Sequence, residues 1–248
     1  MSSLRISEER GVRYMHFGSR WVQGAMRMSR PFALELEYTR YMLFPLLLRS
    51  DPSWPRRVLL IGLGAGSLTK FLYRERPRAS LDVVEIREDV MHAAREFFRV
   101  PDDAARVSIK IADGAHFVAG RDEHYDLILI DGYDARGRVG SLDTPLFHRH
   151  CRARLRRDGI VTTNLLSRHR GVDESLERMR AAHDGRAFAL PPCASGNIVV
   201  VGVAGAAIEL DGSVLAPRAR ALREASGLDL GPLVKKLDRA KAGAPSVI

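Results

Sequence analysis

Two carboxylates and a tyrosine stand together in Asp131-Gly-Tyr-Asp134, directly after the strongly apolar run Tyr125 to Ile130. One acid can take up a proton while the other keeps its charge, and the tyrosine ring offers a face to a cation. The loop that follows contains two more glycines and could close over a ligand and exclude water. These residues predict a site for a cation or an amine, with an ordinary acidic turn as the alternative interpretation.

A second candidate site is the glycine loop in the segment Val58 to Ser67, where Gly62, Gly64 and Gly66 follow a continuous apolar run. Such a run is typical of a strand buried on both faces, and the glycines let the backbone turn sharply beside a ligand. The dinucleotide fingerprint has its third glycine one place later, where this chain has Ser67. The spacing therefore favours a ligand of the S-adenosylmethionine type over NAD, with a plain tight turn as the alternative.

Two further acids follow apolar segments and could belong to the same ligand site as the glycine loop. Glu85 lies 23 positions after Gly62, close to the spacing of about 20 residues at which an acid meets a ribose diol. In Asp113-Gly114, the carboxylate could read an adenine amino group and the glycine could admit the ring. A turn former or a helix cap is the alternative interpretation for each of these acids.

These residues require a fold that brings strand ends together, and the alternation of strands and helices predicts an α/β fold with a doubly wound, mainly parallel sheet. The expected strands after the glycine-loop strand are Leu81–Val84, Val107–Ile111, Tyr125–Ile130, Ile160–Thr163 and Ile198–Val203. Ligands of such sheets lie beyond the carboxyl ends of the strands. We therefore expect one site to be built by Gly62, Glu85, Asp113, Asp131 and Asn164.

The remaining segments predict three parts of the chain: a small N-terminal β-hairpin and helix cap (1–50), a Rossmann-like transferase domain (51–205) and a C-terminal helical tail (206–248). Val12–Phe17 and Ser19–Val22, separated by Gly18, predict the hairpin. Apolar residues at helical spacing predict a helix from Phe32 to Leu48, kinked at Pro45. The tail pattern predicts two short helices separated at residues 227–232, followed by a disordered end.

Composition limits the class of protein further. The chain has 248 residues, 46% of them hydrophobic, which is enough for one substantial core. Its net charge of +9 comes mostly from scattered arginines without interleaved aromatics, so we expect a basic surface rather than nucleic-acid binding. Without a membrane-length apolar span or a signal-peptide core, we expect a cytoplasmic protein that does not bind membranes. His148, His150 and Cys151 lack a partner set of ligands, so we expect no metal site.

With these residues in place, the chain resembles the spermidine synthase family of polyamine aminopropyltransferases, in its short bacterial spermidine-synthase-like form, over residues 10–205. The segments that carry the resemblance are Trp21-Val-Gln-Gly24, Glu35-Leu-Glu-Tyr38, the glycine loop, Glu85, Asp113-Gly114 and Asp131-Gly-Tyr-Asp134. The resemblance implies a class I S-adenosylmethionine-dependent transferase fold and commonly a homodimer. It also implies transfer of an aminopropyl group from decarboxylated S-adenosylmethionine to a small di- or polyamine such as putrescine.

The resemblance further implies roles for individual residues. Asp131 would be the base that removes a proton from the attacking amine, since an alkylammonium with a pKa of about 10 is no nucleophile. The acceptor would be bound by Asp134, Tyr38, Tyr133 and Thr39. The donor would be bound by Gln23, Gly62, Gly64, Ala65, Gly66, Glu85, Asp113 and Gly114.

Three positions depart from the family pattern: Ala65 replaces the usual loop aspartate, Thr39 the usual histidine or glutamine, and Ala135 the usual proline. The missing loop acid would remove a charge-assisted contact to the donor's ammonium worth about 1.5 to 3 kcal/mol. Two alternatives therefore stay open, an S-adenosylmethionine-dependent N-methyltransferase of a small amine and a nucleoside-binding homologue without catalysis. An NAD oxidoreductase is disfavoured by the loop spacing.

Overall fold

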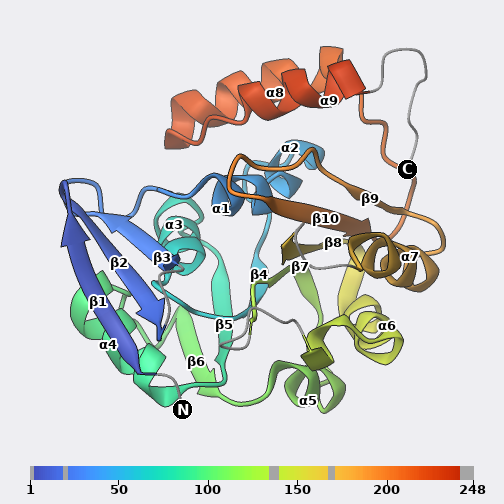
Figure 1. Cartoon of the computed structure of the whole chain (residues 1–248). Coiled ribbons are helices and arrows are strands. Elements are labelled where there is room, and N and C mark those ends of the chain that lie inside the picture. Colours follow the sequence, from blue (N-terminus) through green and yellow to red (C-terminus); the bar gives the residue numbers. More distant parts are fainter. Residues whose placement is uncertain (1–2, 19–21, 134–139, 167–170, 241–248) are drawn as a thin grey trace.

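A seven-stranded sheet forms the centre of the computed structural model, which describes residues 3–18, 22–133, 140–166 and 171–240 (Figure 1). Its strands are β4 (Arg57–Ile61), β5 (Ser80–Glu85), β6 (Val107–Ile111), β7 (Tyr125–Ile130), β8 (Leu155–Leu166), β9 (Ala187–Ala189) and β10 (Asn197–Val203). They lie in the order β6-β5-β4-β7-β8-β10-β9, parallel from β6 to β8, with β10 antiparallel to both neighbours. The chain changes winding direction between β4 and β7, and open α/β sheets bind ligands at such a point. The predicted doubly wound, mainly parallel sheet is confirmed.

Helices cover both faces of the sheet, which explains the lack of alternation in its central strands. Val58 and Leu60 of β4 belong to one buried cluster, whereas Leu59 and Ile61 belong to another. The first cluster includes residues of α1 (Glu37–Met42), α2 (Pro45–Leu48), α3 (Ser67–Glu75) and α4 (Glu88–Phe98). The second includes residues of α5 (Gly114–Ala119), α6 (Pro145–Ala153) and α7 (Val172–Ala182). A strand between two helical layers must be apolar on both sides.

The N-terminal segment forms a three-stranded antiparallel sheet, in the order β1 (Leu4–Glu9), β2 (Val12–Phe17), β3 (Val22–Arg27). The expected hairpin is therefore present, but its second strand starts at Val22 and runs further than the sequence suggested. Most of the expected strand Ser19–Val22, including Trp21, lies outside the described residues. The extra strand β1 was missed because its apolar alternation is short: only Leu4 and Ile6 are apolar, and two glutamates follow.

Several element boundaries differ from expectation. The expected helix from Phe32 begins only at Glu37, and Pro45 starts a second helix, α2, instead of kinking the first. Proline lacks the N–H that a helix interior needs, and it is well suited to the first helical turn. Asn164 lies inside β8 and does not end it, because this strand continues to Leu166 beside β10.

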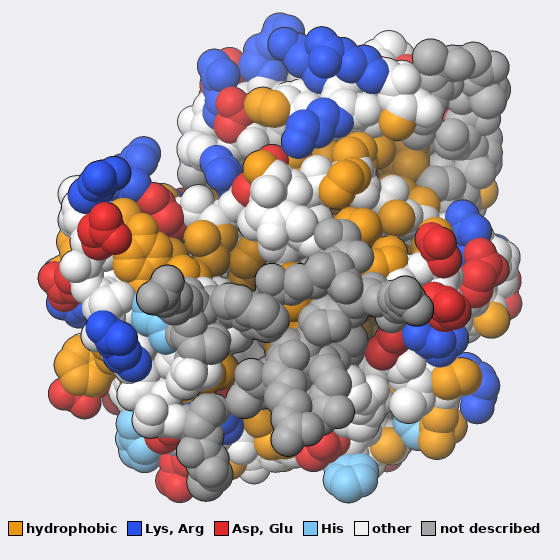
Figure 2. Space-filling model, in the orientation of Figure 1, with side chains coloured by type: hydrophobic (Ala, Val, Ile, Leu, Met, Phe, Trp, Pro, Cys, Tyr) orange, Lys and Arg blue, Asp and Glu red, His pale blue; other side chains and the backbone are white. Residues whose placement is uncertain are grey.

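The C-terminal segment folds back as two helices, α8 (Gly212–Ser226) and α9 (Gly231–Ala240), on the side of α2 (Figure 1). Their apolar side chains belong to the same buried cluster as the sheet: Leu215, Ala219, Leu222, Leu233, Val234 and Leu237. Lysine and arginine side chains gather over these two helices in Figure 2. The two expected helices are present, but the break between them covers only 227–230, because α9 already begins at Gly231. The expected disordered end lies outside the described residues. The domain boundaries at 50 and 205 stay predictions.

None of the helices in the described ranges combines the length and the apolar character that crossing a membrane requires.

Candidate active site

A cavity of about 650 Å³ opens at the carboxyl edge of the parallel strands. The predicted site residues that line it are Gln23, Tyr38, Thr39, Gly62, Gly64, Ala65, Glu85, Asp113, Gly114, Asp131 and Tyr133. Gly66 does not line it, and Asp134 lies outside the described residues. The convergence inferred from strand ends is thus observed for nearly every predicted residue that the structure describes.

Backbone geometry and close packing explain why glycine stands at two positions of the loop. Gly62 has φ +96°, and a Cβ atom there would lie 2.3 Å from the backbone oxygen of Asp131. Gly66 has φ +65° at the start of α3, and a Cβ atom there would lie 2.2 Å from Val100 Cγ2. Left-handed backbone favours glycine, and both spaces exclude a side chain. The glycine loop therefore packs directly against the backbone of Asp131 and the side chain of Val100, where a side chain on either glycine would not fit.

Ala65, which replaces the acid expected from the resemblance, is 2% exposed and packs on the N-terminal sheet. A Cβ atom built on Gly24 of β3 would lie 2.5 Å from the methyl carbon of Ala65. The methyl group belongs to a small apolar cluster with Met15, Met26 and Phe98. A larger or charged side chain at this position would have to displace β3 or point into the cavity.

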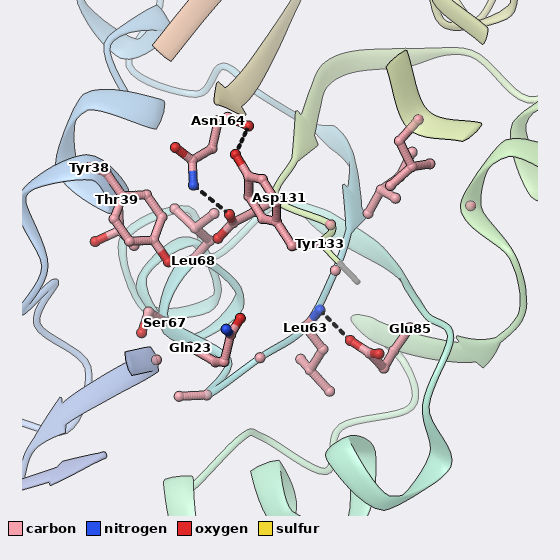
Figure 3. Close-up of a pocket in the computed structure, with 18 of the residues that line it drawn as sticks. Gln23, Tyr38, Thr39, Leu63, Ser67, Leu68, Glu85, Asp131, Tyr133 and Asn164 are labelled. Carbon is pink, nitrogen blue, oxygen red and sulfur yellow. Dashed lines mark hydrogen bonds between the residues drawn. The ribbon is translucent and has the colours of Figure 1, made fainter. Parts of the chain in front are cut away.

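Glu85 is fixed at the edge of the cavity by the backbone around it. Its Oε2 accepts a hydrogen bond of 2.9 Å from Leu63 N (Figure 3), and its Oε1 accepts one of 3.0 Å from Arg87 N. Burial raises the pKa of this carboxyl, and the backbone hydrogen bonds oppose that rise. Each carboxylate oxygen has a second lone pair, so the group can also accept hydrogen bonds from a ligand.

Asp113 and Gly114 have structural tasks at the start of α5. Asp113 Oδ1 accepts hydrogen bonds from the backbone nitrogens of Ala115 and His116, at 2.8 and 3.0 Å. A Cβ atom on Gly114 would lie 2.5 Å from Ile61 Cγ2. The helix cap accounts for one oxygen of Asp113, and close packing accounts for the glycine. His116 is exposed on α5.

Asp131 is the carboxylate at the centre of the other side of the cavity. Its Oδ1 accepts a hydrogen bond of 2.8 Å from Asn164 Nδ2. Burial raises the pKa of Asp131, hydrogen bonds from Asn164 and Tyr38 oppose the rise, and the charge of Glu85 adds to it. Burial and the charge of Asp131 in turn hold the pKa of Tyr38 well above its usual range. A buried carboxylate with raised proton affinity is suited to accept a proton.

Two other predicted acceptor residues, Tyr133 and Thr39, line the same cavity as Asp131. The hydroxyl of Tyr133 donates to the backbone oxygen of Asn164, and Figure 3 shows its ring beside Asp131. Thr39 is buried, and its hydroxyl donates to Leu36 O at 2.7 Å, at the start of α1. Gln23 reaches the cavity from β3 (Figure 3).

Three residues of this region were missed by the sequence interpretation. Ser195 lines the cavity from the loop before β10, and Asn197 lines it as the first residue of β10. Asn197 Nδ2 donates to Asn164 Oδ1 at 3.0 Å. Glu37 lines it from α1, and its Oε2 accepts from Ala194 N at 2.8 Å. The only signal in the sequence was a polar residue next to an apolar stretch in each case, which is too common to single them out.

The cavity is acidic although the chain is basic. Among the described lining residues, the charged side chains are Glu37, Glu85, Asp113, Asp131 and Arg87. Arg87 forms an ion pair with Asp89. A cationic ligand therefore meets mainly carboxylates in the cavity, despite the positive surface over α8 and α9. No group of three or more metal-binding side chains was found in the described part of the chain.

The sequence matches the family described as spermine/spermidine synthase domain over residues 37–187. The polyamine aminopropyltransferase of Chromobacterium violaceum is 33% identical over 96% of this chain and 90% of its own length. The polyamine aminopropyltransferase of Neisseria meningitidis is also 33% identical, over 97% of this chain and 90% of its own length. Among solved structures, a probable spermidine synthase from Corynebacterium glutamicum has a TM-score of 0.75 at 20% identity, covering 92% of both chains.

Proposed function

The chain belongs to the spermine/spermidine synthase family, and we propose that it transfers an aminopropyl group from decarboxylated S-adenosylmethionine to a di- or polyamine. One observation carries this proposal. A buried carboxylate of raised pKa, Asp131, shares one acidic cavity with the glycine loop and with Glu85. The combination suits a reaction in which a cationic amine must lose a proton beside a nucleoside donor.

On the donor side, we propose that Glu85 accepts hydrogen bonds from the two ribose hydroxyls. Its backbone contacts to Leu63 and Arg87 hold the carboxylate rigid, which reduces the entropy cost of binding. Gly64, Ala65 and Gln23 would surround the rest of the donor, with Asp113 and Gly114 at the adenine end. A solved spermidine synthase in complex with the transition-state analogue AdoDATO shares the fold, with a TM-score of 0.58 at 21% identity over 81% of this chain and 73% of its own.

On the acceptor side, Asp131 would take a proton from the attacking ammonium group. The freed amine nitrogen then bonds to the propyl carbon while the carbon–sulfur bond breaks, and methylthioadenosine leaves as a neutral thioether. Tyr38, Tyr133 and Thr39 would line the path of the acceptor. Asp134, proposed to hold the distal ammonium, lies outside the described residues. The raised pKa of Asp131 brings its proton affinity closer to that of the amine, which favours the transfer.

The test is an assay of the purified protein with decarboxylated S-adenosylmethionine and a panel of amines: putrescine, cadaverine, agmatine and spermidine. We expect methylthioadenosine and an aminopropylated product, identified by mass spectrometry, with at least one of these amines. A parallel series with S-adenosylmethionine tests methyl transfer. A methylated amine in that series, without aminopropylation in the first, would overturn the proposal.

We also propose a homodimer located in the cytoplasm, on the resemblance to the family. Sedimentation velocity of the purified protein tests the dimer, because a single species at the monomer mass across micromolar concentrations contradicts it.

A further inference from the structure

Three side chains form a hydrogen-bonded chain that ends at Asp131. Ser195 Oγ donates to Asn197 Oδ1 at 2.7 Å, Asn197 Nδ2 donates to Asn164 Oδ1 at 3.0 Å, and Asn164 Nδ2 donates to Asp131 Oδ1 at 2.8 Å. Asn164 is 2% exposed and Asn197 is 6% exposed. Buried amides whose polar atoms are all paired are held in a single orientation.

The direction of these hydrogen bonds follows from the negative charge of the Asp131 carboxylate. An ionised carboxylate only accepts hydrogen bonds, so the Asn164 amide must turn its nitrogen toward Asp131. Its oxygen then faces Asn197, which must present its own nitrogen. The hydroxyl of Ser195 completes the series by donating to the oxygen of Asn197. With Asn197 in this orientation, rotation of the Asn164 amide would set its oxygen against the carboxylate of Asp131 and its nitrogen against the nitrogen of Asn197.

The sheet brings these residues onto one face. Asn164 is paired with Val199 in the antiparallel ladder of β8 and β10, and Asn197 lies two residues before Val199. Residues in this diagonal relation point to the same side of a sheet and lie within reach of each other. The parallel neighbour of β8 is β7, which ends at Ile130, directly before Asp131. Three adjacent strands therefore build the chain of hydrogen bonds.

The outer end of the chain is anchored by the helices above the sheet. Ala194 N, next to Ser195, donates to Glu37 Oε2 at 2.8 Å. Lys236 of α9 lies 3.4 Å from Glu37 Oε1 and donates to the hydroxyl of Tyr41 at 3.0 Å. The loop that carries Ser195 is thus tied to α1, and through Lys236 to the C-terminal helix.

We propose that Asn197 is a positioning residue, which fixes the Asn164 amide so that Asp131 keeps the hydrogen bond from Asn164 while its carboxylate faces the acceptor amine. This inference rests on the proposed function, in which Asp131 is the base. When the support of Asn197 is lost, the Asn164 amide is free to turn its oxygen toward Asp131, and the ionised carboxylate loses a donor. The protonated form is then favoured, and the base works only at higher pH.

Other groups near Asp131 also influence its titration. The titratable side chains that face it in the described residues are Tyr38 from α1, Glu85 from β5 and Tyr133 from its own strand end. None of them is altered by a change at Asn197, so a shift in the titration of Asp131 reports on the amide chain.

The first variant is Asn197→Leu, which keeps the approximate volume and removes both polar atoms. We expect the pKa of Asp131 to rise by about one unit and the acid limb of the kcat profile to move with it, because a carboxylate hydrogen bond is lost. At neutral pH kcat should fall about 10-fold, while the affinity for methylthioadenosine stays within about threefold. Ser195→Ala removes only the outer link and should shift the pKa in the same direction by less.

Thr163→Val is the matched control. Thr163 precedes Asn164 in β8 and is 1% exposed, and its hydroxyl has no hydrogen-bond partner among the described residues. The substitution changes a buried polar atom in the same strand without touching the amide chain. We expect an unchanged titration of Asp131 and an unchanged pH profile of kcat.

The decisive measurement is ¹³C NMR of protein labelled at the aspartate carboxyl carbon, without donor or amine, with the signal assigned by its loss in Asp131→Asn. A raised pKa in Asn197→Leu, absent in Thr163→Val, supports the proposal. An unchanged pKa in a folded Asn197→Leu protein overturns it. Where Asn197→Leu does not fold, the same measurement is made on Ser195→Ala. A raised pKa of Asp131 in that variant supports the proposal, and an unchanged pKa overturns it. Since this titration needs no turnover, a failed aminopropyl-transfer assay contradicts the proposed function and leaves this result standing.

Discussion

The two halves of the cavity are built in different ways. The donor half, which is the half proposed to bind the donor, consists of Gly62, Gly64 and Ala65 of the glycine loop and of Glu85, which is held by the backbone nitrogens of Leu63 and Arg87. The acceptor half, which is the half proposed to bind the acceptor, consists of side chains that are hydrogen-bonded to one another: Asp131 directly after β7, Asn164 in β8, Asn197 in β10 and Tyr38 in α1. Figure 3 shows Tyr38, Asp131 and Asn164 gathered on one side of the cavity, with Leu63 and Glu85 on the other.

This difference has a physical consequence. A backbone-built site is determined by residue types that allow particular φ and ψ angles, so it tolerates changes elsewhere in the chain. A network of side chains depends on strand register and on every partner being present, so one substitution alters the others. We therefore expect substitutions in one half to leave the other half's task nearly intact.

The largest effect should come from Asp131→Asn, which keeps the shape of the side chain and removes the proton acceptor. We expect kcat to fall about 10² to 10⁴-fold, while the affinity for methylthioadenosine changes less than about threefold. Steady-state kinetics and calorimetry on the same preparation measure both. Near-normal turnover in the folded variant would falsify the assignment of Asp131 as the base, and a parallel loss of donor affinity would show that the two halves are not separable.

The next effect should appear in the donor half. Glu85→Ala removes the proposed ribose partner and its hydrogen bonds from the backbone nitrogens of Leu63 and Arg87, so the affinity for methylthioadenosine should fall about 10- to 100-fold. Glu88→Ala is the control, because Glu88 lies nearby on α4 with its side chain 71% exposed. Calorimetry should find unchanged affinity for the control. Equal affinity in Glu85→Ala and the wild type would remove the ribose assignment.

A smaller effect concerns Asp143, which secures the turn that brings Leu142 to the cavity wall. Burial acts to raise its pKa, but hydrogen bonds from His148, Arg178 and Ser175 lower it from 3.8 to about 2. A lowered folded-state pKa stabilises the protein above the unfolded value near 3.8, and this stabilisation is lost as the pH falls from about 4 toward 2.

We therefore expect Asp143→Asn to cost about 1 to 2 kcal/mol of unfolding free energy at pH 7. The difference from the wild type should shrink below pH 4, as far down as both proteins still fold. Urea unfolding at a series of pH values measures it. A difference that stays constant over that range would mean that the charge of Asp143 contributes nothing.

The smallest effect should come from Thr39→Val. The hydroxyl of Thr39 donates a hydrogen bond to Leu36 O, at the start of α1. Losing this hydrogen bond should cost about 1 kcal/mol of unfolding free energy. The acceptor KM should change less than about threefold, because the side chain would line the acceptor path mainly by its shape. A tenfold rise in KM at unchanged stability would show instead that the hydroxyl binds the amine directly.

The features that the sequence determined by itself are those set by local rules. The glycine loop and the strand that ends before Asp131 were found because positive φ favours glycine and because a strand buried on both faces is continuously apolar. Glu85 was found because its spacing from Gly62 follows the length of one βαβ unit. The bounds of β6 and β7 agree with those inferred from the sequence.

Only the tertiary structure decided which polar residues support those already found. Asn197 reaches Asn164 because β10 is antiparallel to β8 in one particular register, and a shift by one residue would turn it to the other face of the sheet. Glu37 and Lys236 are 199 positions apart and meet because α9 folds back over α1. Hydrophobic patterning shows that such strands and helices exist, but it carries no information on the pairing of one polar side chain with another. That pairing is set by packing across the whole core.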